Sequence, residues 1–196
     1  WQACGTGYNG SFHKETGEPL VNETRFPSVK SFCDSLHAMN LSCAWYMNNC
    51  GCAEKTFTDD ALISRIYEKS VAALVQWGTD EVKLDGCSQF QNTSRWASLL
   101  TRAGKTIKVD YGIENCHNNH SYQDMWLDKL TPSDNKPGAL LSPELCPFNF
   151  FRTGSDMRAT WDRMIRNLES QAPFQSWTQP GCWAYADMME VANPPG

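Results

Sequence analysis

The alternation of short strand-like segments with longer helix-like segments is the strongest constraint on what this chain can fold into. The helix-like segments carry apolar residues at three- and four-residue steps, and the strand-like segments are short runs of β-branched, aromatic and large apolar residues. Strands that alternate in this way with helices form right-handed βαβ units around a parallel sheet, so the sequence predicts an α/β fold. Helices are expected at 29–39, 63–77, 96–104 and 157–168, and strands at 41–47, 81–85, 106–114, 147–152 and 182–188.

Several helix ends are marked by residues with special backbone preferences. Pro27 suits the first turn of the first helix, and Asn40 suits a left-handed residue that ends it. Gly78 and Gly104 are expected to end the second and third helices.

Two parallel architectures are compatible with this alternation. A doubly wound nucleotide-binding sheet has no support, because no Gly-x-Gly-x-x-Gly or phosphate loop follows the first strands. The other choice is a (β/α)₈ TIM barrel, which usually takes about 250 residues. Five strands in 196 residues are about five of its eight β/α units, so we expect residues 1–196 to be the central portion of a single barrel domain, with units missing at both ends.

Charge and cysteine content narrow the class of protein. Lys and Arg number 17 against 22 Asp and Glu, for a net charge of -5, which argues against nucleic acid as a partner. The longest apolar stretches fall short of the ~20 residues of a membrane span. Nine cysteines and five glycosylation sequons predict a secreted or lumenal protein, whether extracellular, lysosomal or vacuolar. The sequons are at Asn9, Asn22, Asn40, Asn92 and Asn119.

The strand at 81–85 carries the clearest chemical signal. Its alternation puts Val82 and Leu84 on one face and Lys83 with Asp85 on the other. In a barrel, the charged face points inward near the C-terminal mouth, where enzymes of this fold keep their catalytic groups. An exposed ion pair at the end of an edge strand fits the spacing equally well.

Further acids follow other strands. Glu114 and Asp187 close two of them, and Asp156 follows Arg152 in the turn before the fourth helix, where an aspartate could also be a helix cap. Carboxylates and cations at the ends of separate strands suit a sugar, because they bind hydroxyl groups and a carboxylate pair can cleave a glycosidic bond. Eight Trp and six Tyr supply surfaces on which sugar rings stack.

Five segments together resemble glycoside hydrolase family 27, the family of α-galactosidases and α-N-acetylgalactosaminidases. They follow the order and approximate spacing of that family over nearly the whole chain. The segments are 22–28 (NETRFPS), 45–50 (WYMNNC), 82–87 (VKLDGC), 152–156 (RTGSD) and 181–191 (GCWAYADMMEV).

The resemblance implies a retaining hydrolase on a (β/α)₈ barrel that releases terminal α-linked galactose. Asp85 matches the nucleophile and Asp156 the general acid/base, with carboxyl groups about 5 to 5.5 Å apart. Lys83 and Arg152 match ligands of the sugar hydroxyls, and their charge favours an ionised Asp85. The positions that match the rest of the pocket are Tyr46, Glu114, Asp187 with Met188, and Trp1. Two carboxylates suffice for this chemistry, so no cofactor and no metal are expected.

The family pattern also implies disulfides. Cys87 is expected to bridge to Cys50 or Cys52, and Cys116 to Cys146, while Cys4 is expected to pair with a cysteine upstream of Trp1.

The chain also departs from the family pattern. Relatives carry two aspartates just before the tryptophan that Trp1 matches, as well as a first barrel strand, a last one and a C-terminal β-sandwich, and these parts are absent from this sequence. The Asn-Asp-Pro-Asp stretch of many relatives is Ala184-Tyr185-Ala186-Asp187 here.

Three readings stay open at this stage. The first is an active α-galactosidase. The second is a non-catalytic barrel that serves as a glycan-binding or structural subunit, and the third is a related specificity, for α-N-acetylgalactosaminides or β-L-arabinopyranosides. The expected partner is an α-galactoside-type carbohydrate, and both a homodimer and a larger extracellular assembly are compatible with the sequence.

Overall fold

The structure is a computed structural model that describes residues 3–47, 52–86, 90, 92–113, 149–154, 159–175, 178 and 180–187. For residues 85, 86, 93, 94, 110–113 and 173 it describes the backbone alone. The chain divides into two compact units, Trp1–Asp110 and Tyr111–Gly196, which we call the N-terminal and C-terminal units.

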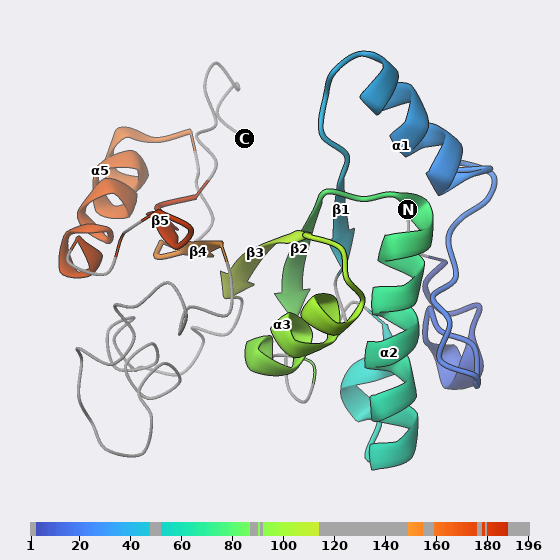
Figure 1. The fold of residues 1–196 in the computed structure, drawn as a ribbon. Helices are drawn as coiled ribbons and strands as arrows, with labels where there is room; N and C mark the ends of the chain where they lie inside the picture. The colour runs from blue at the N-terminus through green and yellow to red at the C-terminus, as the bar shows by residue number, and fades with distance from the viewer. Residues whose placement is uncertain are drawn as a thin grey trace. The chain divides into compact units, whose positions relative to one another are not determined.

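The N-terminal unit is an α/β arrangement in which β1 and β2 are each followed by a helix (Figure 1). Strands β1 and β2 pair in parallel, and the spatial order β1-β2-β3 is the order in the sequence. The elements are η1 (Tyr8–Gly10), α1 (Val29–Ala38), β1 (Ala44–Met47), η2 (Ala53–Thr56), α2 (Asp60–Trp77), β2 (Glu81–Gly86), α3 (Thr93–Arg102) and β3 (Lys108–Ile113), the last of which runs past the end of the unit.

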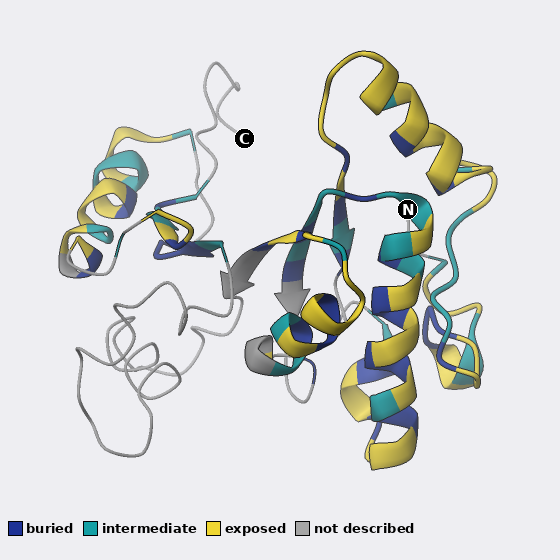
Figure 2. Cartoon of the chain, in the orientation of Figure 1, coloured by how far each residue is buried: buried dark blue, intermediate teal, exposed yellow. Residues whose placement is uncertain are grey.

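Helix α2 has clear start and stop signals. The Asp59 carboxylate accepts hydrogen bonds from the backbone amides of Ala61 (2.8 Å) and Leu62 (3.2 Å), which would otherwise lack partners in the first turn. Gly78 ends the helix in a left-handed conformation, as expected, with φ of 81°. One side of α2 is buried and the other is exposed (Figure 2), as in a helix that covers a sheet.

The start of α1 differs from the expectation, and its end agrees with it. Ser28, not Pro27, defines the start, because the Ser28 hydroxyl accepts a hydrogen bond from the Ser31 amide and Pro27 lies before this cap. Asn40 has φ of 58°, which confirms the left-handed stop. A disulfide between Cys33 and Cys43 then joins the helix to the residue before β1.

The two faces of β1 and β2 differ in polarity. Trp45, Met47, Val82 and Leu84 are all buried, so the face that they share forms part of the core. Trp45 contacts Trp77 of α2 with ring centroids 5.4 Å apart. The apolar face of the strands therefore lies under the helices, as the alternation predicts, and the charged residues belong to the other face.

The C-terminal unit contains β4 (Phe150–Arg152), α5 (Trp161–Glu169), η5 (Ala172–Phe174) and β5 (Trp183–Tyr185). Strands β4 and β5 pair in parallel, with Arg152 opposite Tyr185. Phe151 packs edge-on against Phe174, with ring centroids 5.7 Å apart. Backbone hydrogen bonds continue the pairing beyond the strands, from the Thr153 amide to Tyr185 O (2.8 Å) and from the Gly154 amide to Ala186 O (3.1 Å).

These elements confirm the predicted α/β class with parallel strands. Four of the five strands are shorter than the sequence runs that predicted them, whereas β2 extends one residue further, to Gly86, and the fourth helix begins at Trp161. None of the helices in the described part of the chain is long and apolar enough to cross a membrane. Closure into a barrel stays an expectation.

Candidate functional site

In the N-terminal unit, the candidate residues follow the polar face of β1 and β2. The strand register puts Tyr46 opposite Lys83, and both side chains are half-buried. Asp85 belongs to β2, two residues further along, and its side chain is outside the described part. Strand β2 lies between β1 and β3, so the alternative of an edge strand is wrong.

In the C-terminal unit, Arg152 and Asp187 form a buried ion pair. Arg152 is the last residue of β4, and Asp187 lies two residues beyond β5. Arg152 Nη1 donates a hydrogen bond to Asp187 Oδ1 at 3.3 Å, and the two side chains are only 7% and 8% exposed. Taking two charges out of water is costly, and such a pair adds little to stability compared with apolar residues of the same size. A buried ion pair at the carboxyl ends of two parallel strands therefore points to a role in binding.

The backbone of Asp187 is unusual. Its φ is 147°, a value that residues with a side chain seldom adopt. Strained residues of this kind gather at binding and catalytic sites, where the surrounding structure holds them.

Helix capping is not the role of Asp156 at α5. The cap of this helix is Thr160, whose hydroxyl accepts a hydrogen bond from the Arg163 amide. Asp156 itself lies outside the described residues, as do Trp1, Glu114 and Met188. Their roles stay predictions.

One expected disulfide is wrong. Cys4 bonds to Cys52, with Cα atoms 5.5 Å apart, and not to a cysteine upstream of Trp1. The N-terminal segment returns to η2, which brings these two cysteines together over 48 residues of sequence. Because a cysteine forms one disulfide, Cys52 is no longer open as a partner for Cys87. The other cysteines of the expected bridges lie outside the described residues: Cys50, Cys87, Cys116 and Cys146.

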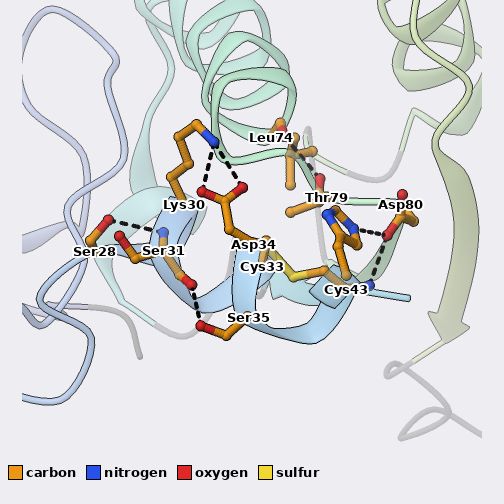
Figure 3. Close-up of a disulfide and its surroundings, with 11 residues drawn as sticks. Ser28, Lys30, Ser31, Cys33, Asp34, Ser35, Cys43, Leu74, Thr79 and Asp80 are labelled. Carbon is orange, nitrogen blue, oxygen red and sulfur yellow. Dashed lines mark hydrogen bonds and ion pairs between the residues drawn. A yellow bond between two sulfur atoms is a disulfide. The ribbon is translucent and has the colours of Figure 1, made fainter. Parts of the chain in front are cut away.

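The disulfide between Cys33 and Cys43 is a feature that the sequence did not predict. Figure 3 shows it beside Asp80, whose carboxylate accepts a hydrogen bond from the Cys43 amide at 2.8 Å. Asp80 Oδ2 also lies 2.7 Å from His37 Nε2 at the end of α1. The bridge holds the middle of α1 to the residue before β1, and the Asp80 carboxylate holds the end of the helix to the starts of β1 and β2.

Three of the five sequon asparagines, Asn9, Asn40 and Asn92, are exposed. Asn22 is half-buried, and its side-chain oxygen accepts a hydrogen bond from the Arg25 amide at 3.3 Å. Asn92 caps α3 through its side-chain oxygen, which accepts from the Arg95 amide at 2.9 Å. Asn119 lies outside the described residues. Whether any of them carries a glycan stays a prediction.

Sequence reasoning missed a buried polar cluster around His13, Glu54 and Ser70. All three are fully buried. His13 Nδ1 donates to Glu54 Oε1 at 2.9 Å, and His13 Nε2 lies 3.3 Å from Ser70 Oγ. No spacing in the sequence marks this contact, because the three residues come from a loop, a 3₁₀ turn and the middle of α2. Neither this cluster nor any other group of His, Cys, Asp or Glu side chains in the described ranges is arranged to hold a metal ion.

Comparisons with known proteins agree with the motif resemblance, although no family model matches the chain. The chain is 25% identical over 180 residues to a Dictyostelium discoideum protein named as a probable α-galactosidase. The alignment covers 90% of this chain and 41% of the relative. It is 25% identical over 191 residues to the α-N-acetylgalactosaminidase of Gallus gallus, with 90% and 42% coverage. The chain thus spans about two fifths of the length of these relatives.

A solved structure shares the fold. It is a Bacteroides fragilis protein provisionally named as an α-galactosidase/melibiase, with a TM-score of 0.65, 18% identity and coverage of 91% of this chain and 36% of its own. The sequence comparisons therefore confirm the predicted resemblance to α-galactosidases and α-N-acetylgalactosaminidases, and the solved structure confirms a likeness of fold.

Proposed function

We propose, on the premise of this likeness, that the chain is part of the (β/α)₈ catalytic barrel of a retaining α-galactosidase-type glycoside hydrolase. The observation that carries the proposal is the buried pair of Arg152 and Asp187 at the ends of parallel strands. In barrels of this kind, the carboxyl ends of the strands form the active site. A guanidinium and a carboxylate that are already held together there can share hydrogen bonds with adjacent sugar hydroxyls.

The reaction takes two steps. In the first, the Asp85 carboxylate forms a bond to the anomeric carbon while the glycosidic bond breaks, and Asp156 gives its proton to the leaving oxygen. In the second, Asp156 takes a proton from water, and the water oxygen replaces Asp85 at the anomeric carbon. The sugar leaves with its original anomeric configuration, and both carboxyl groups return to their starting state.

The remaining residues bind the sugar. Lys83 shares its strand face with Tyr46, which supplies an aromatic surface beside a cation. Lys83 and Arg152 bind hydroxyls, and Asp187, Glu114 and Trp1 contribute to the pocket wall. The substrate is a terminal α-linked galactose, with α-N-acetylgalactosaminides and β-L-arabinopyranosides as the nearest alternatives.

The disulfides indicate the cellular compartment. The bonds Cys4–Cys52 and Cys33–Cys43 persist in oxidising compartments, so we place the protein in the secretory route, with glycans on its exposed sequons.

The experiment is hydrolysis of an aryl α-galactoside by the natural full-length protein, with Asp85→Asn as the control variant. We expect turnover in the wild type and a loss on the order of a thousandfold or more in the variant. A folded wild-type protein that hydrolyses neither this substrate nor the two alternatives would contradict the proposal and favour a non-catalytic glycan-binding or structural subunit.

A further inference from the structure

Helix α5 buries a polar residue where an apolar one is expected. All nine of its side chains are described, and the one that is buried is Asn167, which is 2% exposed. Leu168, which the apolar pattern places on the buried side, is 49% exposed. A buried amide must find hydrogen-bond partners to avoid a large cost, so the partners of Asn167 indicate why it is there.

The amide of Asn167 reaches the ends of both strands of the C-terminal unit. Its Nδ2 donates to Ala186 O at 3.4 Å, and Ala186 O also accepts from the Gly154 amide at 3.1 Å. Space is tight at this point, since a Cβ atom on Gly154 would lie 2.4 Å from Ala186 O and 2.8 Å from Asn167 Cγ. Asn167 therefore lies against the junction of the two chain segments that leave β4 and β5.

A second set of contacts ties the same helix to the same junction. The Thr153 hydroxyl lies 2.9 Å from Ser170 Oγ and 3.2 Å from Tyr185 O. Ser170 Oγ in turn donates to Asn167 O at 2.6 Å. Thr153 is fully buried, so these bonds are protected from water.

The anchored backbone atoms are the neighbours of the ion pair. Thr153 follows Arg152, and Ala186 precedes Asp187. We propose that Asn167 is a positioning residue, which holds these two strand ends so that Arg152 and Asp187 keep the geometry that the substrate requires. The inference rests on the proposed function, because that function assigns the pair of Arg152 and Asp187 to substrate binding.

The test compares Asn167→Ala and Asn167→Asp with a control, Phe174→Leu, in the full-length protein. The aspartate variant keeps the size of the side chain and removes the donor to Ala186 O. Phe174 is buried and its ring packs against Phe151, and a phenyl ring makes none of the hydrogen bonds of the junction, so its truncation reduces stability without removing a bond of that network. Assays with an aryl α-galactoside are run well below the melting temperature of every variant.

We expect kcat/KM to fall at least tenfold in both Asn167 variants and to stay within twofold of the wild type in Phe174→Leu. Thr153→Val, which removes one hydroxyl from the same network, is expected to give a smaller loss and serves as the second variant if Asn167→Ala does not fold. The inference would be overturned if kcat/KM fell no more in the Asn167 variants than in Phe174→Leu at the same decrease in Tm.

A readout without substrate separates this inference from the proposed function. Hydrogen exchange of the Thr153 and Gly154 amides is expected to accelerate at least tenfold in Asn167→Ala, while the amides of β2 are unchanged. Unchanged exchange at both amides overturns the positioning role. An inactive wild-type protein overturns the proposed function, whatever the exchange result.

Discussion

The carboxylate of Glu54 accepts hydrogen bonds from the His13 ring at 2.9 Å and from the Phe12 amide at 2.8 Å, in a fully buried cluster. This contact fastens the N-terminal loop to η2. The Cys4–Cys52 bond joins the same two segments covalently.

We expect this cluster to be a major contributor to stability. Glu54→Ala removes the acceptor of a buried histidine and should lower the free energy of unfolding by about 3 to 5 kcal/mol. Both bonds go to Oε1, so the amide oxygen of Glu54→Gln can still accept them, but the variant puts a buried NH₂ group in place of Oε2 and should cost about 1 to 3 kcal/mol. The measurement is urea denaturation, with the exposed Glu23→Gln as a control that should stay within about 0.5 kcal/mol of the wild type. A loss below about 0.5 kcal/mol in Glu54→Ala would show that the cluster carries no such contribution.

The acid sensitivity of the N-terminal unit should depend in part on Asp80. Burial by itself raises the pKa of the Asp80 carboxyl, but the hydrogen bond from the Cys43 amide and the bond and charge of His37 outweigh this effect, so that its pKa lies below the usual value. A carboxyl whose pKa is lower in the folded state adds stability above its unfolded pKa, about 3.9, and that stability is lost as pH falls through the folded pKa.

Asp80→Asn should therefore cost about 1 kcal/mol at neutral pH, a modest value because the Asp80 side chain is 37% exposed. The difference from the wild type should shrink as pH falls below about 4. Urea denaturation at pH 6 and pH 3 measures both values. A difference that is the same at the two pH values would contradict this role.

The buried ion pair of Arg152 and Asp187 should show strong energetic coupling. A double-mutant cycle with Arg152→Ala and Asp187→Ala is expected to give an interaction free energy above about 1 kcal/mol in unfolding experiments. The matched control is the pair of Arg166 and Asp162 on α5, which is closer at 2.8 Å but 67% and 72% exposed, and which should give at most about 0.5 kcal/mol. Equal coupling in the two pairs would indicate that burial does not set the strength of the first.

Loss of the proposed acid/base should depend on the leaving group. Asp156→Ala is expected to reduce turnover of an alkyl α-galactoside by about a hundredfold or more, because the leaving oxygen then departs without a proton. An aryl α-galactoside with a strongly acidic phenol should lose far less in its first step. Parallel assays of the two substrates decide the point, and equal losses would exclude Asp156 as the acid.

Local signals in the sequence were enough for much of the fold. The alternation of Val82 and Leu84 with Lys83 gave the correct faces of β2, and Gly78 marked the end of α2, because both depend on neighbours in the chain. Tyr46 and Lys83 were expected on separate strands of one pocket, and the register puts them opposite each other.

Contacts between distant segments were not predictable in the same way. Disulfide connectivity cannot be deduced from cysteine positions, so the partner of Cys4 was wrong. Asn167 is buried where its side chain donates to the backbone carbonyl of Ala186. Because every residue has such a carbonyl, no sequence pattern marks this partner. The apolar residues that predicted the helix at 157–168 therefore do not include the residue that α5 buries.

The most direct test of the central claim is to trap the sugar on its nucleophile. A 2-deoxy-2-fluoro-galactosyl donor with a good leaving group forms the glycosyl-enzyme and hydrolyses slowly, because fluorine at C2 destabilises both oxocarbenium-like transition states. Mass spectrometry of peptides from the labelled full-length protein should find the fluorosugar on Asp85, with no label in Asp85→Asn. A stable adduct on another carboxylate, or an active enzyme that releases the inverted sugar and forms no adduct, would contradict the account.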